Sequence, residues 1–128
     1  MARYEEWIER AKSALELAQA KIIRHIHYED LCFQTQQAAE KAIKGLLIYY
    51  GVEPEFTYNI ERLLNELKKY TEIPKNIGKS ALLTDYASQT RYPGEYDDIT
   101  KEDYEKAVHI AQECLDWVEG IIKRNGEE

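Results

Sequence analysis

The sequence predicts an all-α protein, an up-and-down bundle of about five helices. Apolar residues recur at alternating spacings of four and three near both ends of the chain, which is the pattern of helices with one inward face. Between these segments, the stretch from Gln34 to Gly51 has an apolar side that covers about half of a helical circumference. No stretch has a convincing strand pattern, so all predicted elements are helical.

The stretch from Gln34 to Gly51 is predicted to be the central helix. Its apolar side is wider than the stripe of about 100° on an ordinary surface helix, so other helices should contact it from several directions. Glu40 and Lys44 are four residues apart in the favourable order for an ion pair. Gly51 ends the helix and Pro54 prevents it from resuming. The apolar side comprises Leu31, Ala38, Ala39, Ala42, Ile43, Leu46, Leu47, Tyr49 and Tyr50, and the polar side comprises Gln34, Gln37, Glu40, Lys41 and Lys44.

A long helix is expected at each end of the chain. The first runs from Tyr4 to about Ile22, and the last begins after Thr100 and ends at Gly126. Thr100-x-x-Asp103 resembles a capping box with Asp in place of Glu. The inward residues of the first helix are Tyr4, Ile8, Ala11, Leu15, Ala18 and Ile22, widened by Trp7, Ala14 and Leu17. Those of the last helix are Tyr104, Val108, Ala111, Leu115, Val118 and Ile122, widened by Trp117 and Ile121.

Two shorter helices are expected between the central helix and the last one. Asn59 is the predicted N-cap of the first of them. Pro74 can occupy the first turn of the second, in which Gly78 costs about 1 kcal/mol. The expected inward residues are Ile60, Leu63, Leu64, Leu67 and Tyr70 in the first and Ile77, Ala81, Leu82 and Tyr86 in the second.

Length and charge restrict the class of protein. A chain of 128 residues fits a single domain, residues 1–128, that can bury a core without covalent staples. The net charge of −7 opposes broad, non-specific nucleic-acid binding and an anionic membrane partner, although it is compatible with a local basic groove. The N-terminus lacks a signal-peptide pattern and no apolar run is long enough to span a bilayer, so we expect a cytoplasmic protein. Cys32 and Cys114 are then expected to be reduced core residues.

The segment from Thr90 to Ile99 is the longest one without helical periodicity, and it is rich in Tyr, Arg and Asp. Arg91 can hold a phosphate in a fork of hydrogen bonds, and Tyr92 and Tyr96 are candidate ligand contacts in the same loop. An alternative is that Arg91 pairs with acidic side chains of its own loop. On the central helix, Lys41 is a further candidate, although it can equally belong to a solvent-exposed face. Gln36 lies at the edge of the apolar side, where it can be a buried hydrogen bonder or can meet a ligand.

The acidic residues of this region do not predict a metal site. Glu95, Asp97, Asp98 and Asp103 lack the spacing of a calcium loop, and they suit the positive end of the helix that follows. A di-iron bundle needs Glu-x-x-His pairs, and none occurs in the sequence. Phosphate-binding glycine loops are absent too. We therefore expect no metal and no cofactor.

The run from Cys32 to Leu47, followed by Gly51, resembles the central-helix signature of HEPN domains (higher eukaryotes and prokaryotes nucleotide-binding), and its Gln-Gln-Ala-Ala-Glu-Lys-Ala core is the most specific part. Thr90-Arg91-Tyr92-Pro93 and the Asp-Asp-Ile-Thr that precedes the last helix are similar to that family too. The resemblance covers almost the whole chain and implies a bundle of about five helices that commonly forms homodimers. Members often act beside a small nucleotidyltransferase in a two-component toxin–antitoxin pair.

Other HEPN domains cleave RNA without a metal, using an Arg followed four to six residues later by a His, and here the sequence departs from the family. Counting from Arg91, that window holds Glu95, Tyr96 and Asp97, and Tyr58 stands where many relatives have another His. A tyrosine titrates near pH 10, so Tyr96 is a poor base at neutral pH, where a histidine would serve. The departure argues against catalysis.

Three hypotheses follow. The first is a HEPN-like protein, homodimeric, that binds a nucleotide or RNA phosphate near Arg91 or pairs with a nucleotidyltransferase. The second is a divergent, metal-independent endoribonuclease in which Tyr96 or a His from elsewhere replaces the missing group. The third is a non-catalytic helical interaction module, in which Arg91 would be dispensable.

Overall fold

The computed structural model describes residues 3–20, 25–87 and 98–126. Within these ranges the chain forms five α-helices and one 3-10 helix and no strand, which confirms the predicted all-α class. The elements are α1 (Tyr4–Ala18), α2 (Tyr28–Tyr49), α3 (Ile60–Leu67), α4 (Lys75–Gly78), the 3-10 helix η1 (Lys79–Ala87) and α5 (Lys101–Gly126). None of the described helices combines the length and apolar content needed to cross a membrane.

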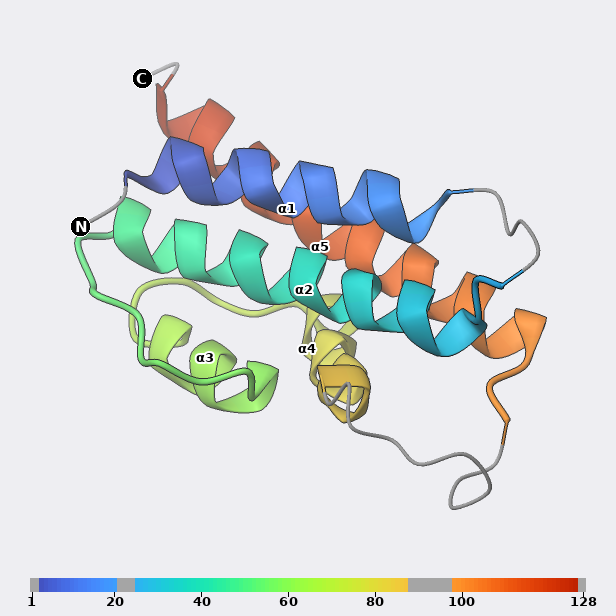
Figure 1. The fold of residues 1–128 in the computed structure, drawn as a ribbon. Helices are drawn as coiled ribbons and strands as arrows, with labels where there is room; N and C mark the ends of the chain where they lie inside the picture. Colours follow the sequence, from blue (N-terminus) through green and yellow to red (C-terminus); the bar gives the residue numbers. More distant parts are fainter. Residues whose placement is uncertain (1–2, 21–24, 88–97, 127–128) are drawn as a thin grey trace.

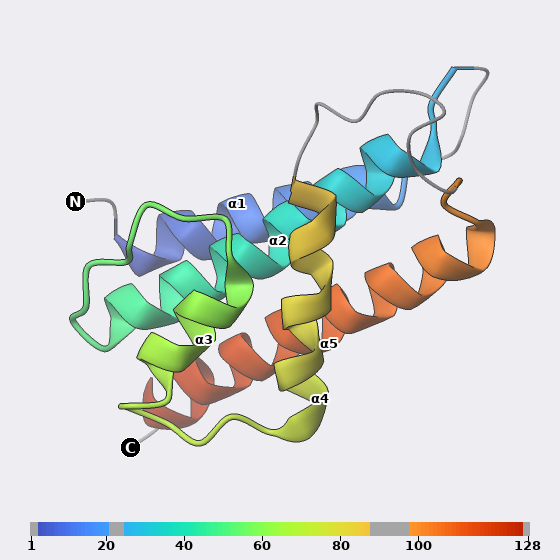
Figure 2. The ribbon, with the colours of Figure 1, turned by 90° about the horizontal axis from the view of Figure 1, so that it is seen from below.

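The three long helices lie side by side, and α1 runs in the opposite direction to α2 and α5 (Figure 1). The start of α1 and the end of α5 are therefore at the same end of the bundle. α3 and η1 pack on the side of α2 that is turned away from α1, and η1 crosses α2 and α5 at a steep angle (Figure 2). Only the long helices thus follow the up-and-down arrangement.

α2 is the central helix, as predicted, because it contacts α1, α3, α5 and η1. It begins at Tyr28, within the short link that was expected near His27 to Asp30, and the backbone N–H of His27 donates to the Asp30 carboxylate at 3.3 Å. It ends at Tyr49, and Gly51 follows in the left-handed conformation with φ 83°. Only glycine adopts that conformation without strain, so Gly51 explains the sharp end of the helix.

The inward faces of α1 and α5 agree closely with the predicted seams. Thr100 and Asp103 cap α5 reciprocally, with the Thr100 N–H donating to the Asp103 carboxylate at 3.0 Å and the Asp103 N–H to Thr100 Oγ1 at 3.1 Å. Leu17 was expected to widen the α1 seam and is 54% exposed, so that expectation is wrong. The described helix ends at Ala18, and Ile22 lies outside the described residues.

The second short helix differs most from its prediction. One α-helical turn, α4, continues as the 3-10 helix η1, in which three residues make a turn and every third side chain faces the same way. Ile77, Ser80 and Leu83 are accordingly buried, whereas Leu82, expected to be inward, is 67% exposed. The first short helix, α3, is capped by Asn59 as predicted but ends at Leu67, so Tyr70 lies beyond it.

Candidate functional site

The predicted ligand residues fall in different parts of the chain. Arg91, Tyr92 and Tyr96 lie outside the described residues. Gln36 and Lys41 both lie on α2, but five helical positions correspond to a rotation of about 140°, so they belong to different faces. Gln36 is completely buried and Lys41 is half-buried. The structure therefore does not bring these two side chains into one site.

Gln36 belongs to a buried polar network along one face of α2. The Glu40 carboxylate accepts a hydrogen bond from Gln36 Nε2 at 3.1 Å and from Lys44 Nζ at 2.9 Å. Gln37 Nε2 donates to Gln36 Oε1 at 2.8 Å and approaches the same Glu40 oxygen at 3.5 Å. Glu40 and Lys44 are only 8% and 7% exposed. The predicted ion pair is thus confirmed, but the expectation that both residues lie on a polar surface is wrong.

The network fixes the connection between α2 and α3. Gln36 Nε2 also donates to the backbone carbonyl of Tyr58 at 3.0 Å, across 22 positions in the sequence. Two residues later, the backbone N–H of Ile60 donates to Thr84 Oγ1 of η1 at 3.1 Å. Of the alternatives for Gln36, the buried hydrogen bonder is therefore the one observed. This hydrogen bond is partly buried, and a carbonyl left there without a donor would be unfavourable, which explains an amide at this core position.

Lys44 joins the same network to α1. Its ammonium group lies 5.7 Å from the centre of the Trp7 ring, within the range of a cation–π contact. At the neighbouring residue, Gly45, α1 lies very close to α2, because an added Cβ there would lie 2.9 Å from Ile8 Cδ1 and 3.1 Å from Trp7 Cβ. The sequence contained a signal for this arrangement in the Glu40–Lys44 spacing, but nothing in it showed that the pair is buried.

The start of α5 follows directly on the segment that carries Arg91. The hydrogen bonds from Thr100 lower the pKa of the exposed Asp103 carboxyl below its ordinary value of 3.8. Asp103 therefore acts as a cap with its charge at the positive end of the helix, as predicted. Glu95 and Asp97 lie outside the described residues, so their expected contribution stays a prediction.

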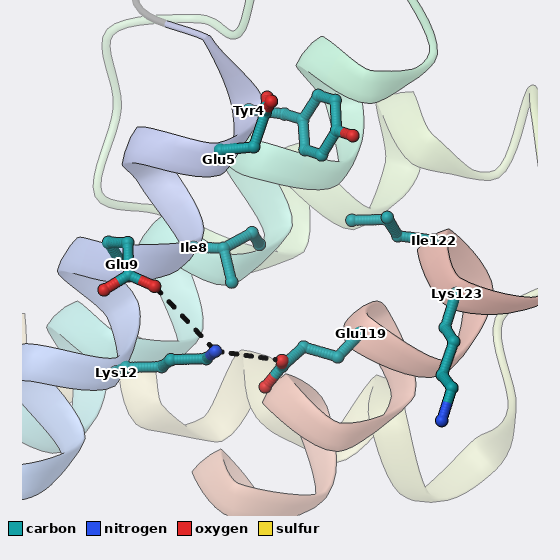
Figure 3. A pocket seen from close by; sticks show the side chains of 8 residues that line it. All are labelled: Tyr4, Glu5, Ile8, Glu9, Lys12, Glu119, Ile122 and Lys123. Carbon is teal, nitrogen blue, oxygen red and sulfur yellow. Dashed lines mark ion pairs between the residues drawn. The ribbon is translucent and has the colours of Figure 1, made fainter. Parts of the chain in front are cut away.

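A hollow of about 280 Å³ lies between the start of α1 and the end of α5 (Figure 3). Its apolar lining comes from Tyr4, Ile8 and Ile122. Lys12 extends along it, with its Nζ 3.2 Å from Glu119 Oε2 and 3.9 Å from Glu9 Oε1. Among the predicted ligand residues that the structure describes, neither Gln36 nor Lys41 lines this hollow, so we interpret the ion pairs as a link between the two helices.

Both cysteines lie in the core. Cys32 on α2 and Cys114 on α5 are buried and form no disulfide, as expected. Burial raises the pKa of the Cys114 thiol to about 12, and a contact with the Ser80 hydroxyl offsets only part of that effect. A thiol in this state is neutral at physiological pH and is a poor nucleophile or metal ligand.

A comparison with protein families decides the relationship that the central helix suggested. Residues 4–121 match the model of the HEPN domain. The chain is a HEPN domain protein. That match covers all the described helices except the last turn of α5, and it confirms the resemblance seen in the run from Cys32 to Leu47.

Similar proteins and structures agree with this assignment. The chain is 28% identical to "Putative toxin MJ1304" of Methanocaldococcus jannaschii over 91% of this chain and 86% of that protein. ST0689, an archaeal HEPN homologue of known crystal structure, has a TM-score of 0.72 and 33% identity, covering 95% of this chain and 99% of the homologue. TT1696 from Thermus thermophilus has a TM-score of 0.79 and 31% identity, covering 94% and 98%.

Proposed function

We propose that this HEPN domain protein is one component of a toxin–antitoxin pair, that it forms a homodimer, and that it binds a nucleotide or RNA phosphate with Arg91. A nucleotidyltransferase is the proposed partner. The observation that carries the proposal is the similarity to a protein named as a toxin, which extends over 91% of the chain. The family match over residues 4–121 supports the same assignment.

The residues around Arg91 favour binding over cleavage. Metal-free RNA cleavage needs a group that takes the proton of the 2′-hydroxyl and a cation that stabilises the phosphate. Arg91 supplies the cation, but Glu95, Tyr96 and Asp97 stand where cleaving members have a histidine. Of the described histidines, His109 pairs with Glu113 on its own helix, α5. Arg91 would then hold the phosphate through its planar fork of donors.

The pairing is tested in cells. The chain is expressed alone, and then together with a nucleotidyltransferase from the same organism. We expect growth arrest in the first case, recovery in the second, and copurification of the two proteins. Normal growth with the chain alone, together with no copurification, would contradict the toxin–antitoxin assignment.

The ligand is tested with purified protein by titrating nucleotides and short RNAs at low salt into the wild type and Arg91→Ala. We expect binding that the substitution weakens. No binding at low salt and no effect of Arg91→Ala would reject the ligand. Incubation with cellular RNA distinguishes RNA cleavage from RNA binding. Cleavage that depends on Arg91 would establish catalysis despite the missing histidine.

A further inference from the structure

Lys41 stands out among the charged residues of the structure. Most of the described lysines and arginines have exposed side chains. Among these described residues, Lys12 and Lys41 are half-buried and Lys44 is buried. Lys12 is paired with Glu9 and Glu119, and Lys44 with Glu40. Lys41 forms no ion pair or hydrogen bond with any described residue. A partly desolvated cation without a counter-charge is unfavourable unless an anion approaches it.

The nearest acid in the sequence cannot serve as that anion. Glu40 precedes Lys41, but its carboxylate already receives hydrogen bonds from Lys44, Gln36 and Gln37. Glu40 is also buried, and it lies about 100° around the helix from Lys41. Within the part of the chain that the structure describes, the ammonium group of Lys41 therefore has no counter-charge in an ion pair.

Helical register places Arg10 of α1 at the level of Lys41 and on the same side of the bundle. Trp7 packs against Gly45, and the two helices run in opposite directions, so one turn further along α1 corresponds to one turn back along α2. One turn further along α1 from Trp7 is Arg10, and one turn back along α2 from Gly45 is Lys41. Arg10 and Lys41 are therefore at the same level.

The two flanks of α1 can be told apart by their contacts. Lys12 on one flank pairs with Glu119 of α5, and Trp7 on the other contacts Lys44 of α2. Arg10 belongs to the flank of Trp7, turned away from α5. It is exposed and has no ion pair among the described residues, and Glu6, one turn before it, is likewise unpaired.

We propose that Arg10 and Lys41 form an anion-binding surface on the α1–α2 face, and that its ligand is a phosphate group of a nucleotide or of single-stranded RNA. Two cations from neighbouring helices, neither in an ion pair with a described residue, bring positive charge to this face of a protein with a net charge of −7. The Arg10 guanidinium can bind two phosphate oxygens and Lys41 contributes a point charge. The inference rests on the proposed function, and it adds contacts that are independent of Arg91.

The experiment measures binding of a fluorescent oligouridylate by the full chain at several salt concentrations, with AMP and inorganic phosphate as competitors. The variant is Arg10→Gln with Lys41→Gln. Each phosphate contact to a single strand contributes about 0.7 to the slope of log K against log salt. Loss of two contacts should therefore lower the slope by about 1.4, which is roughly 25-fold weaker binding at about 0.1 M salt. Competition by AMP or phosphate separates a mononucleotide site from one that needs an RNA chain.

The matched control is Lys123→Gln with Arg124→Gln, which changes the net charge equally at the exposed end of α5. The control should bind like the wild type. Equal affinity of the control and the Arg10/Lys41 variant would overturn the inference, whatever Arg91→Ala does. A loss confined to the Arg10/Lys41 variant would support this surface even if Arg91→Ala has no effect. A wild type that binds none of the three probes would overturn both proposals.

Discussion

Glu40 and Lys44 carry opposite charges inside the bundle, with side chains only 10% and 9% exposed. Removing two charges from water is costly, and their attraction offsets this only because the other polar atoms are also satisfied. Gln36 and Gln37 provide that second set of contacts. The pair is therefore best understood as part of a network that fixes the connection to α3, since an isolated buried pair adds little stability.

Lys44→Met should destabilise the protein by about 3 kcal/mol or more, because it leaves the Glu40 carboxylate buried without a counter-charge. Urea unfolding monitored by circular dichroism measures the change. The double variant Glu40→Met with Lys44→Met removes both charges and should recover much of the loss. The single variant Glu40→Met is measured as well. If the double variant loses as much free energy of unfolding as the two single variants lose together, this account is wrong.

Gln36 and Gln34 provide a matched pair on the same helix. Gln36→Leu leaves the Tyr58 carbonyl without its donor and removes a hydrogen bond to Glu40, so we expect a loss of about 1–3 kcal/mol in the free energy of unfolding. Gln34 is half-buried and outside the network, and Gln34→Leu should change stability by less than about 0.5 kcal/mol. Similar losses for both variants in urea unfolding would show that the network has no special role.

Helix packing depends on the absence of a side chain at Gly45. Gly45→Ala places a methyl group 2.9 Å from Ile8 Cδ1, which can rotate away, and 3.1 Å from Trp7 Cβ, which can give way only with the backbone of α1. We expect a loss of about 1–3 kcal/mol, despite a gain in helix propensity of about 1 kcal/mol. Gly120 of α5 has no atom within 4 Å of an added Cβ, so Gly120→Ala should stabilise the protein instead. Thermal unfolding of both variants tests this, and a stabilising Gly45→Ala would refute the close approach.

The start of α5 should give a pH-dependent contribution to stability. Because hydrogen bonds from Thr100 lower the pKa of Asp103 in the folded state, its charged form stabilises the protein above its unfolded pKa of about 3.8. The contribution is lost as the pH falls through the folded pKa. Asp103→Asn should thus be less stable than the wild type at neutral pH, and the gap in urea midpoints should narrow below about pH 4. A gap that stays constant with pH would exclude a role for the charge.

The sequence predicted whole helices well where a single spacing of apolar residues held throughout the segment. The four-three seams located α1 and α5, and the wide apolar side identified α2. The pattern failed at η1, because Ile77, Ser80 and Leu83 follow a spacing of three that a 3.6-residue period does not describe. Leu17 was predicted to be inward but is exposed. Periodicity gives the direction in which a side chain points, but it does not show whether a neighbouring helix extends far enough to cover it.

Across the whole molecule, the candidate site was less predictable than the fold. A helical wheel places Glu40 and Lys44 on the polar side, and only the packing of Trp7 and the α2–α3 connection shows that they are buried. The sequence left two roles open for Gln36, a buried hydrogen bonder or a ligand contact, because the residue lies at the boundary between the apolar and polar sides of α2. The significance of Lys41 depends on its having no ion pair with any described residue, which is a tertiary property. Arg91, Tyr92 and Tyr96 remain predictions from the sequence.

The two cysteines test whether residues 1–128 form one cooperative unit. Cys32 and Cys114 lie on different long helices within the same buried cluster. Both thiols are buried, and burial raises the pKa of Cys114 to about 12, so iodoacetamide at about pH 8 should reach neither thiol in the native protein. If the chain is a single domain, both should become reactive at the same urea concentration, which should coincide with the loss of helical circular dichroism. Mass spectrometry of the labelled peptides measures each cysteine separately, and labelling of one before the other would show that α2 and α5 belong to units that unfold independently.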